Sequence, residues 1–224
     1  MHFTPQDIFG LIVGTSFAAG LNVYATVATL GLLARFHVFA LPPSLHAVEN
    51  WWIIGLCLCL FAVEFFADKI PAFDLVWNAL HTFVRVPVAA LLAYHASASM
   101  PPYIQVLAAV LGGTIAFAAH GGKTAARAAV TPSPEPFSNA ALSMSEDVAA
   151  VGLTWFATTH PYIAGVIVAV LLVLIVVFVR FVYRALKKLF VGAEHELQRA
   201  EEAISRPLPR GVIPKINDLE RSDQ

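Results

Sequence analysis

The sequence predicts an all-α protein, a polytopic membrane helix bundle of about six transmembrane helices, and three observations lead to this fold class. Hydrophobic residues make up 58% of the 224 residues, and only 13% are charged, against about 25% in ordinary soluble domains. The mean hydropathy is +0.71. Several apolar runs approach the ~20 residues that a helix needs to cross ~30 Å of hydrocarbon.

The six predicted segments follow one another with short connections. The first has no basic flank of a cleaved signal peptide, so we expect the chain to retain it. The second and sixth are continuous apolar runs, the third contains Pro87 and a polar first half, and the fifth opens on charged residues. The segments cover residues 8–34, 51–67, 75–96, 103–119 (an extension to 129 is left open), 139–158 and 162–182.

The distribution of Lys and Arg predicts the orientation. The connections after the second and fourth segments and the flank after the sixth carry most of the basic residues, whereas the other connections contain only Arg35. Basic residues favour the cytoplasmic side. We therefore expect six crossings with both termini cytoplasmic.

Beyond the last crossing, the composition changes. The membrane domain is predicted over residues 1–183, an amphipathic cytoplasmic helix over 184–205, and a flexible tail over 206–224. Within the membrane domain, GTSFAAG (14–20) resembles GTIAFAAHG (113–121), and an acidic segment follows each. This similarity suggests two inverted three-helix repeats, 8–98 and 103–183, as in many transporters. Chance similarity among small residues that pack helices is the alternative.

The most informative residues are carboxylates in or near apolar runs, because a charge in hydrocarbon costs several kcal/mol, roughly 2.5–3.5 at the helix centre. Glu64 and Asp68 lie one helical turn apart and share a face. Glu146 and Asp147 open the fifth segment, and Asn22 interrupts the first. We predict that these five residues bind an ion or substrate.

Basic and polar residues occur at helical spacing near these acids. Asp74, Asn78, His81 and Arg85 form one polar stripe, and a second descends from the fourth segment. We expect this group to gate the site or to pair with its charges. Its members are Lys69, Asp74, His81, Arg85, His120, Lys123 and Arg127.

Four motifs in the same order resemble a family of bacterial integral membrane proteins known as domain of unknown function 4126. They are EFFADKIPAFD (64–74), HTFVR (81–85), HGGKTAAR (120–127) and the stretch from SPEPFSN (133–139) to SED (145–147). The resemblance covers about residues 8–182. It implies an inner-membrane protein and supplies no activity.

The function that these features favour is a small secondary transporter or channel-like protein, which moves a cation or a proton-coupled small solute. The alternative is a membrane scaffold or assembly factor whose buried charges are structural. An embedded lipid-modifying enzyme that uses His81 or His120 is the third reading, although no catalytic motif supports it. We expect no cofactor, and as partners the lipid bilayer and a small ion or solute. The sequence leaves a metal ion and a homo-oligomer open.

Overall fold

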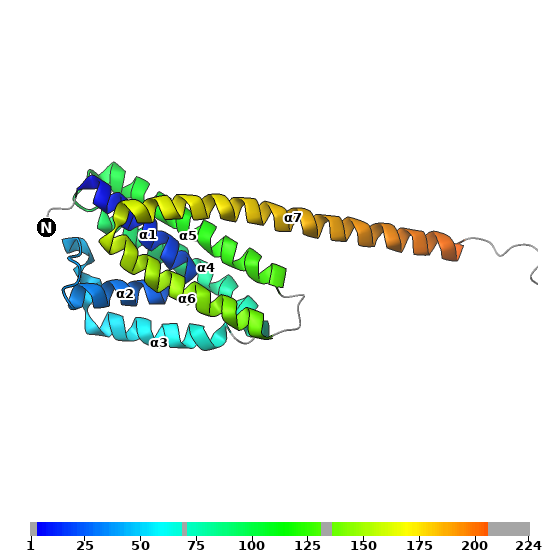
Figure 1. Ribbon diagram of the computed structural model, residues 1–224, viewed down its shortest axis with the longest axis horizontal. Coiled ribbons are helices and arrows are strands. Elements are labelled where there is room, and N and C mark those ends of the chain that lie inside the picture. Colours follow the sequence, from blue (N-terminus) through cyan, green and yellow to red (C-terminus); the bar gives the residue numbers. More distant parts are fainter. Residues whose placement is uncertain (1–3, 69–70, 131–135, 206–224) are drawn as a thin grey trace, which may run out of the picture. The chain divides into compact units, whose positions relative to one another are not determined.

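The computed structural model describes residues 4–68, 71–130 and 136–205, and every regular element in these ranges is a helix. Two compact units divide the chain, Met1–Arg180 and Phe181–Gln224. The predicted domain boundary near residue 183 stays a prediction. The elements (Figure 1) are α1 (Pro5–Leu21), α2 (Val23–Arg35), η1 (Pro43–Glu49), α3 (Trp51–Ala67), α4 (Pro71–Ala96), α5 (Pro102–Val130), α6 (Pro136–Thr159) and α7 (Pro161–Ser205).

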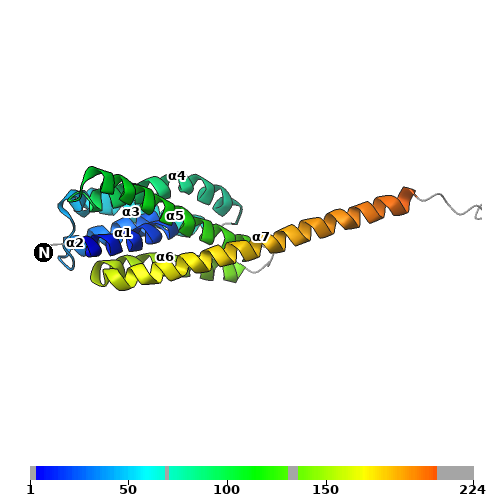
Figure 2. The ribbon, with the colours of Figure 1, turned by 90° about the horizontal axis from the view of Figure 1, so that it is seen from above.

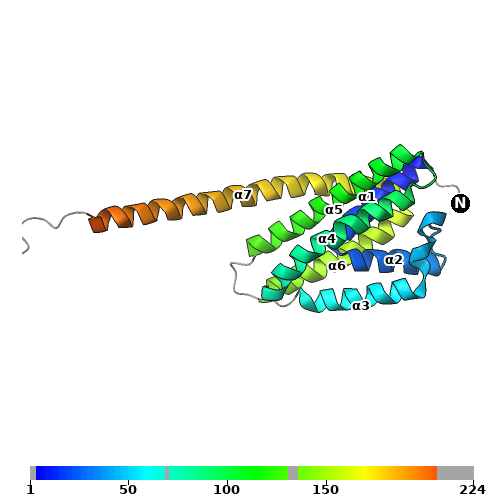
Figure 3. The same cartoon turned by 180° about the vertical axis from the view of Figure 1, so that it is seen from behind.

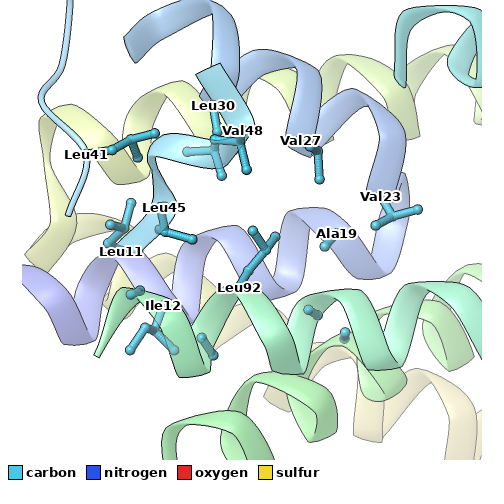
Figure 4. Close-up of a cluster of buried hydrophobic side chains, with 14 of the residues drawn as sticks. Leu11, Ile12, Ala19, Val23, Val27, Leu30, Leu41, Leu45, Val48 and Leu92 are labelled. Atoms are coloured by element: carbon cyan, nitrogen blue, oxygen red, sulfur yellow. The ribbon is translucent and has the colours of Figure 1, made fainter. Parts of the chain in front are cut away.

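The first predicted segment, residues 8–34, is two helices that reverse at Asn22. This residue is extended (φ −149°, ψ 105°), and its N–H donates to Ala18 O at the end of α1. Its side-chain oxygen accepts from Ala25 N at 2.9 Å, so Asn22 also caps α2. In Figure 4, α1 runs from Leu11 to Ala19 and α2 returns from Val23 to Leu30. The prediction of one crossing helix over 8–34 is therefore wrong.

Helix α1 lies at the centre of the first unit and packs against α4, α5 and α6 (Figure 2). Every residue from Gly10 to Gly20 is buried, as expected for a helix that is apolar or small on all sides. A Cβ atom at Gly20 would lie 2.5 Å from Ala116 O of α5. Only glycine therefore permits α1 and α5 to approach this closely.

The remaining predicted segments each coincide with one helix or lie within one (Figure 3). α3 has the predicted bounds and begins after Asn50, whose side chain accepts from Trp52 N at 2.9 Å. α4, α5, α6 and α7 each begin at a proline. Proline suits the first turn of a helix because its fixed φ is already helical and no N–H is lost from the ladder.

Two of the described helices are long and apolar enough to cross a membrane. They are Pro102–Arg127 and Pro161–Ala185, with mean hydropathies of 1.6 and 3.3. A third is added if η1 and α3, which are bent by 61° relative to each other, count as one span. Length and composition alone therefore do not establish the predicted six crossings. The predicted repeats differ in their first element, since a hairpin in one corresponds to the continuous α5 in the other.

Candidate functional site

Charged side chains from four helices are buried together beside the tip of the α1–α2 hairpin. None of these residues is more than 7% exposed. We refer to this set as the charge network. Its members are Glu64 and Asp68 at the end of α3, Arg85 of α4, Lys123 and Arg127 of α5, and Glu146 and Asp147 of α6.

The helical spacing of the sequence brings these groups together. Asp68 lies one turn beyond Glu64, and Arg127 lies one turn beyond Lys123, so each helix presents two charges on one face. On α4, Arg85 shares a face with His81 and Asn78, and all three are buried. Leu80 and Phe83 of the same helix are 59% and 81% exposed. The described part of the predicted polar stripe therefore faces the interior.

Lys123 is the hub of the charge network. Its Nζ lies 3.2 Å from Asp68 Oδ2, 3.1 Å from Glu146 Oε2 and 3.9 Å from Glu64 Oε1. It also donates to Leu21 O at 3.4 Å, a carbonyl in the last turn of α1. A cation at a helix C-terminus is stabilised by the orphan carbonyls and the helix dipole. Lys123 thus ties the hairpin tip to α3 and α6.

Arg127 strengthens the same junction. Its Nη2 lies 2.7 Å from Asp68 Oδ2 and 2.9 Å from Glu146 Oε2. Both carboxylates are therefore ion-paired with two bases, Lys123 and Arg127. Removing either base from so buried a site would leave a carboxylate short of partners, which is much more costly than losing a surface ion pair.

Arg85 pairs with Glu64 and also donates from Nη1 to His120 Nδ1 at 2.7 Å. A guanidinium has no acceptor, so His120 Nδ1 must carry the lone pair. The proton of a neutral His120 then lies on Nε2, which donates to Thr82 Oγ1 at 2.8 Å. The Thr82 hydroxyl in turn donates to Asn78 O at 3.3 Å. The chain from Glu64 to Asn78 is thus consistent with one tautomer.

Asp147 differs from the other three carboxylates of the charge network. Its Oδ1 accepts from Asn22 Nδ2 at 2.9 Å, which joins α6 to the hairpin tip. Its Oδ2 has no hydrogen-bond partner, and no base among the described residues lies within ion-pair distance of it. Asp147 is therefore a buried carboxylate held by an amide.

A second histidine links α4 to α2. His81 Nδ1 lies 2.8 Å from Trp77 O and must donate to this carbonyl. Its Nε2 then accepts from Tyr24 Oη at 3.0 Å if the ring is neutral. His81 therefore anchors the returning helix of the hairpin.

The structure brings all five residues predicted to bind an ion into one buried group. Four of the residues predicted to gate the site or pair with its charges join the same group: Arg85, His120, Lys123 and Arg127. His81 lies outside this group and contacts Tyr24. Lys69 and the side chain of Asp74 lie outside the described residues. The sequence reasoning did not identify Thr82 or the Leu21 carbonyl. Thr82 was detectable, because it lies four residues after Asn78 and shares its face.

Within the described part of the chain, no three His, Cys, Asp or Glu side chains are grouped to hold a metal ion. Apolar pockets lie elsewhere among the described residues of the first unit. One of about 460 Å³ lies between α4 and α5, and one of about 430 Å³ lies between the first turns of α1 and α7.

The model of one sequence family, described as "domain of unknown function (DUF4126)", matches residues 9–181. The chain belongs to this family. The resemblance carried by the four motifs is thereby confirmed, and every member of the charge network lies within the DUF4126 match. No curated protein matches the chain, and no solved structure matches it either.

Proposed function

We propose that this DUF4126 protein is a small secondary transporter or channel-like protein of the bacterial inner membrane. It moves a cation, or a small solute coupled to a proton, past the tip of the α1–α2 hairpin. The observation that supports this proposal is the contact between Asn22 and Asp147, in which a broken helix meets a buried carboxylate without an ion-pair partner.

The depth of Asp147 supports an intramembrane site. Asp147 precedes the last residue of α6, Thr159, by twelve positions, which is about 18 Å along a helix. The hydrocarbon core is only ~30 Å thick. If α6 crosses the bilayer, its carboxylate lies far from either surface. Intramembrane carboxylates usually mark an ion or substrate pathway.

The hairpin supports transport for a second reason. Interrupted backbone is tolerated at membrane depth only where it is buried in protein or lines an aqueous cavity. In transporters, the ends of such broken helices bind ions and charged substrates. In this chain the end of α1 accepts from Lys123, and the start of α2 presents Asn22 to Asp147.

Because of the hairpin, we replace the expected six crossings by a different topology. We propose five crossing helices (α3 to α7) and one re-entrant hairpin. The first turn of α1 lines cavities together with Met100 of the α4–α5 connection and with Pro161 at the start of α7. Arg127 lies on α5 twenty-five residues beyond Pro102, about 38 Å along the helix. With basic residues cytoplasmic, the N-terminus lies outside, contrary to the expectation of two cytoplasmic termini.

A flux assay tests the proposed function. Purified protein in liposomes should carry a cation or proton current down an imposed gradient. The substitution Asp147→Asn preserves the acceptor for Asn22 and removes the charge, so we expect it to abolish flux in a folded protein. Glu49→Gln, which alters an exposed pair with His46, is the matched control and should transport normally. Absence of flux for every cation, proton and solute gradient would contradict the proposal.

One observation favours a second candidate, a membrane scaffold. Glu64, Asp68 and Glu146 are all ion-paired, as a purely structural network requires. A scaffold would retain its partner-dependent activity after Asp147→Asn and would lose it when residues 184–224 are deleted. The transporter reading makes the opposite prediction for Asp147→Asn.

A further inference from the structure

Three buried oxygen atoms on one face of α6 have no hydrogen-bond partner among the described residues. They are Ser143 Oγ, Glu146 Oε1 and Asp147 Oδ2, from residues that are 0%, 7% and 7% exposed. Positions i, i+3 and i+4 of a helix lie next to one another. Unsatisfied buried polar atoms are rare in native proteins and call for an explanation such as an unseen ion or water.

The protein partners of these side chains are already used. Glu146 Oε2 accepts from Arg127 and lies 3.1 Å from Lys123 Nζ, and Asp147 Oδ1 accepts from Asn22. The second oxygen of each carboxylate has no hydrogen-bond partner among the described residues. The Asn22 oxygen accepts from Ala25 N. Lys123, the nearest ammonium on α5, has three donors, and these face Asp68, Glu146 and Leu21 O. The donors of Asn22 and Lys123 therefore contact atoms other than the three oxygens.

The charges of the site add to a single negative excess. The charge network holds four carboxylates and three bases, and both nearby histidines fit their hydrogen bonds as neutral rings. Among the described residues, the charge network therefore carries one more negative than positive charge, and the unpartnered oxygens of Glu146 and Asp147 belong to it.

We propose that Ser143, Glu146 and Asp147 bind one sodium ion, which is the ion that couples to transport. The sodium site itself is inferred from the three unpartnered oxygens. The coupling role of the ion rests on the proposed transport function. A set of hydroxyl and carboxylate oxygens suits a hard cation. A monovalent cation balances the single excess negative charge. Two carboxylate ligands are few for a divalent cation. A single proton on Asp147 would balance the charge but would leave Ser143 and Glu146 unsatisfied.

Sodium binding can be measured without transport. Detergent-purified full-length protein would be assayed for ²²Na⁺ binding and for its melting temperature in NaCl, KCl or choline chloride at equal ionic strength. The wild type should bind sodium and melt higher in NaCl than in the other salts. Ser143→Ala and Asp147→Asn should weaken sodium binding about tenfold or more, because each removes a ligand from a desolvated site.

Ser145→Ala is the matched control. Its side chain is exposed and donates to Leu142 O at 2.7 Å, so this variant should bind sodium as the wild type does. Equal melting temperatures in all three salts, or unchanged sodium binding by Ser143→Ala, would overturn the site. Sodium binding without any flux would refute the transport role and retain the site. Flux that depends on protons and not on sodium would retain the transporter and overturn the sodium assignment.

Discussion

Arg85 illustrates at the residue scale how the charge network stabilises the fold. Its side chain is fully buried, and it joins Glu64 of α3 to His120 of α5. Taking two charges out of water is expensive, and only close pairing with further hydrogen bonds compensates for it. The arrangement therefore depends on each partner being present.

We predict that Arg85→Met destabilises the protein by about 3–5 kcal/mol, because Glu64 would remain buried without its main partner. The measurement is the free energy of unfolding in detergent micelles. Arg35→Met is the control. Arg35 is exposed and lies 5.4 Å above the Trp51 ring, an interaction worth roughly 0.5–1 kcal/mol. Equal losses for the two variants would contradict the structural role of Arg85.

Glu146 and Asp147 are neighbours in sequence with different expected roles. Glu146→Gln weakens two ion pairs with Lys123 and Arg127, so in sodium-free buffer it should lose stability by about 1–3 kcal/mol. Asp147→Asn keeps its hydrogen bond with Asn22 and breaks no ion pair, so its unfolding free energy should change little. The prediction fails if Asp147→Asn is the more destabilised of the two in unfolding experiments.

At the element scale, the α1–α2 hairpin positions the site. α1 approaches α5 closely enough that a methyl group at Gly20 would overlap a backbone carbonyl. This approach brings the end of α1 to Lys123 and the Asn22 side chain to α6. The hairpin is thus specified by small residues along α1 and by one capping residue at the reversal.

Gly20→Ala tests this packing, and Gly152→Ala is its matched control. An added Cβ at Gly20 would displace α1 from α5, whereas the same atom at Gly152 of α6 meets nothing within 4 Å. We expect Gly20→Ala to destabilise the protein by about 1–3 kcal/mol through overpacking. Gly152→Ala should be neutral or stabilising by up to ~1 kcal/mol, because alanine favours a helix. Identical thermal stabilities of the two variants would contradict this packing.

The helices were largely predictable from the sequence, but their directions were not. The 51–67 segment is bounded by Asn50 and by charged residues, so its apolar run matches α3. The Gly20-Leu21-Asn22 interruption was recognisable, yet the same residues permit a kink or a reversal. The choice depends on α2 packing against α3 and α6, which no local pattern encodes.

The same limit applies to the site. Spacing identified which charges share a helix face. It could not identify that Arg85 pairs with Glu64 or that Asp147 meets Asn22, because these contacts depend on how separate helices approach one another. The near balance of acids and bases left ion binding and internal pairing as alternatives. In the structure, Glu64, Asp68 and Glu146 are ion-paired with described bases. Asp147 forms no ion pair with a described base, so internal pairing does not explain its charge.

For the whole molecule, the reversal at Asn22 changes the number of crossings that we propose from six to five. We predict that Gln6→Cys and Lys187→Cys, each in a background without Cys57 and Cys59, react with a membrane-impermeant thiol reagent from opposite sides of the membrane. Both introduced positions are exposed, and both native cysteines are free thiols. Labelling of both positions from the same side would restore the six-crossing topology and exclude a re-entrant hairpin.

The central claim is that ions reach Asp147 through water. It is tested most directly by the reaction of Asp147→Cys with a charged methanethiosulfonate reagent in membranes, in the same cysteine-free background. Val148→Cys is the control, because Val148 is 69% exposed on the outer face of the bundle, where lipid excludes a charged reagent. The account predicts that position 147 reacts, that sodium slows this reaction, and that position 148 does not react. An inert thiol at position 147 would contradict it.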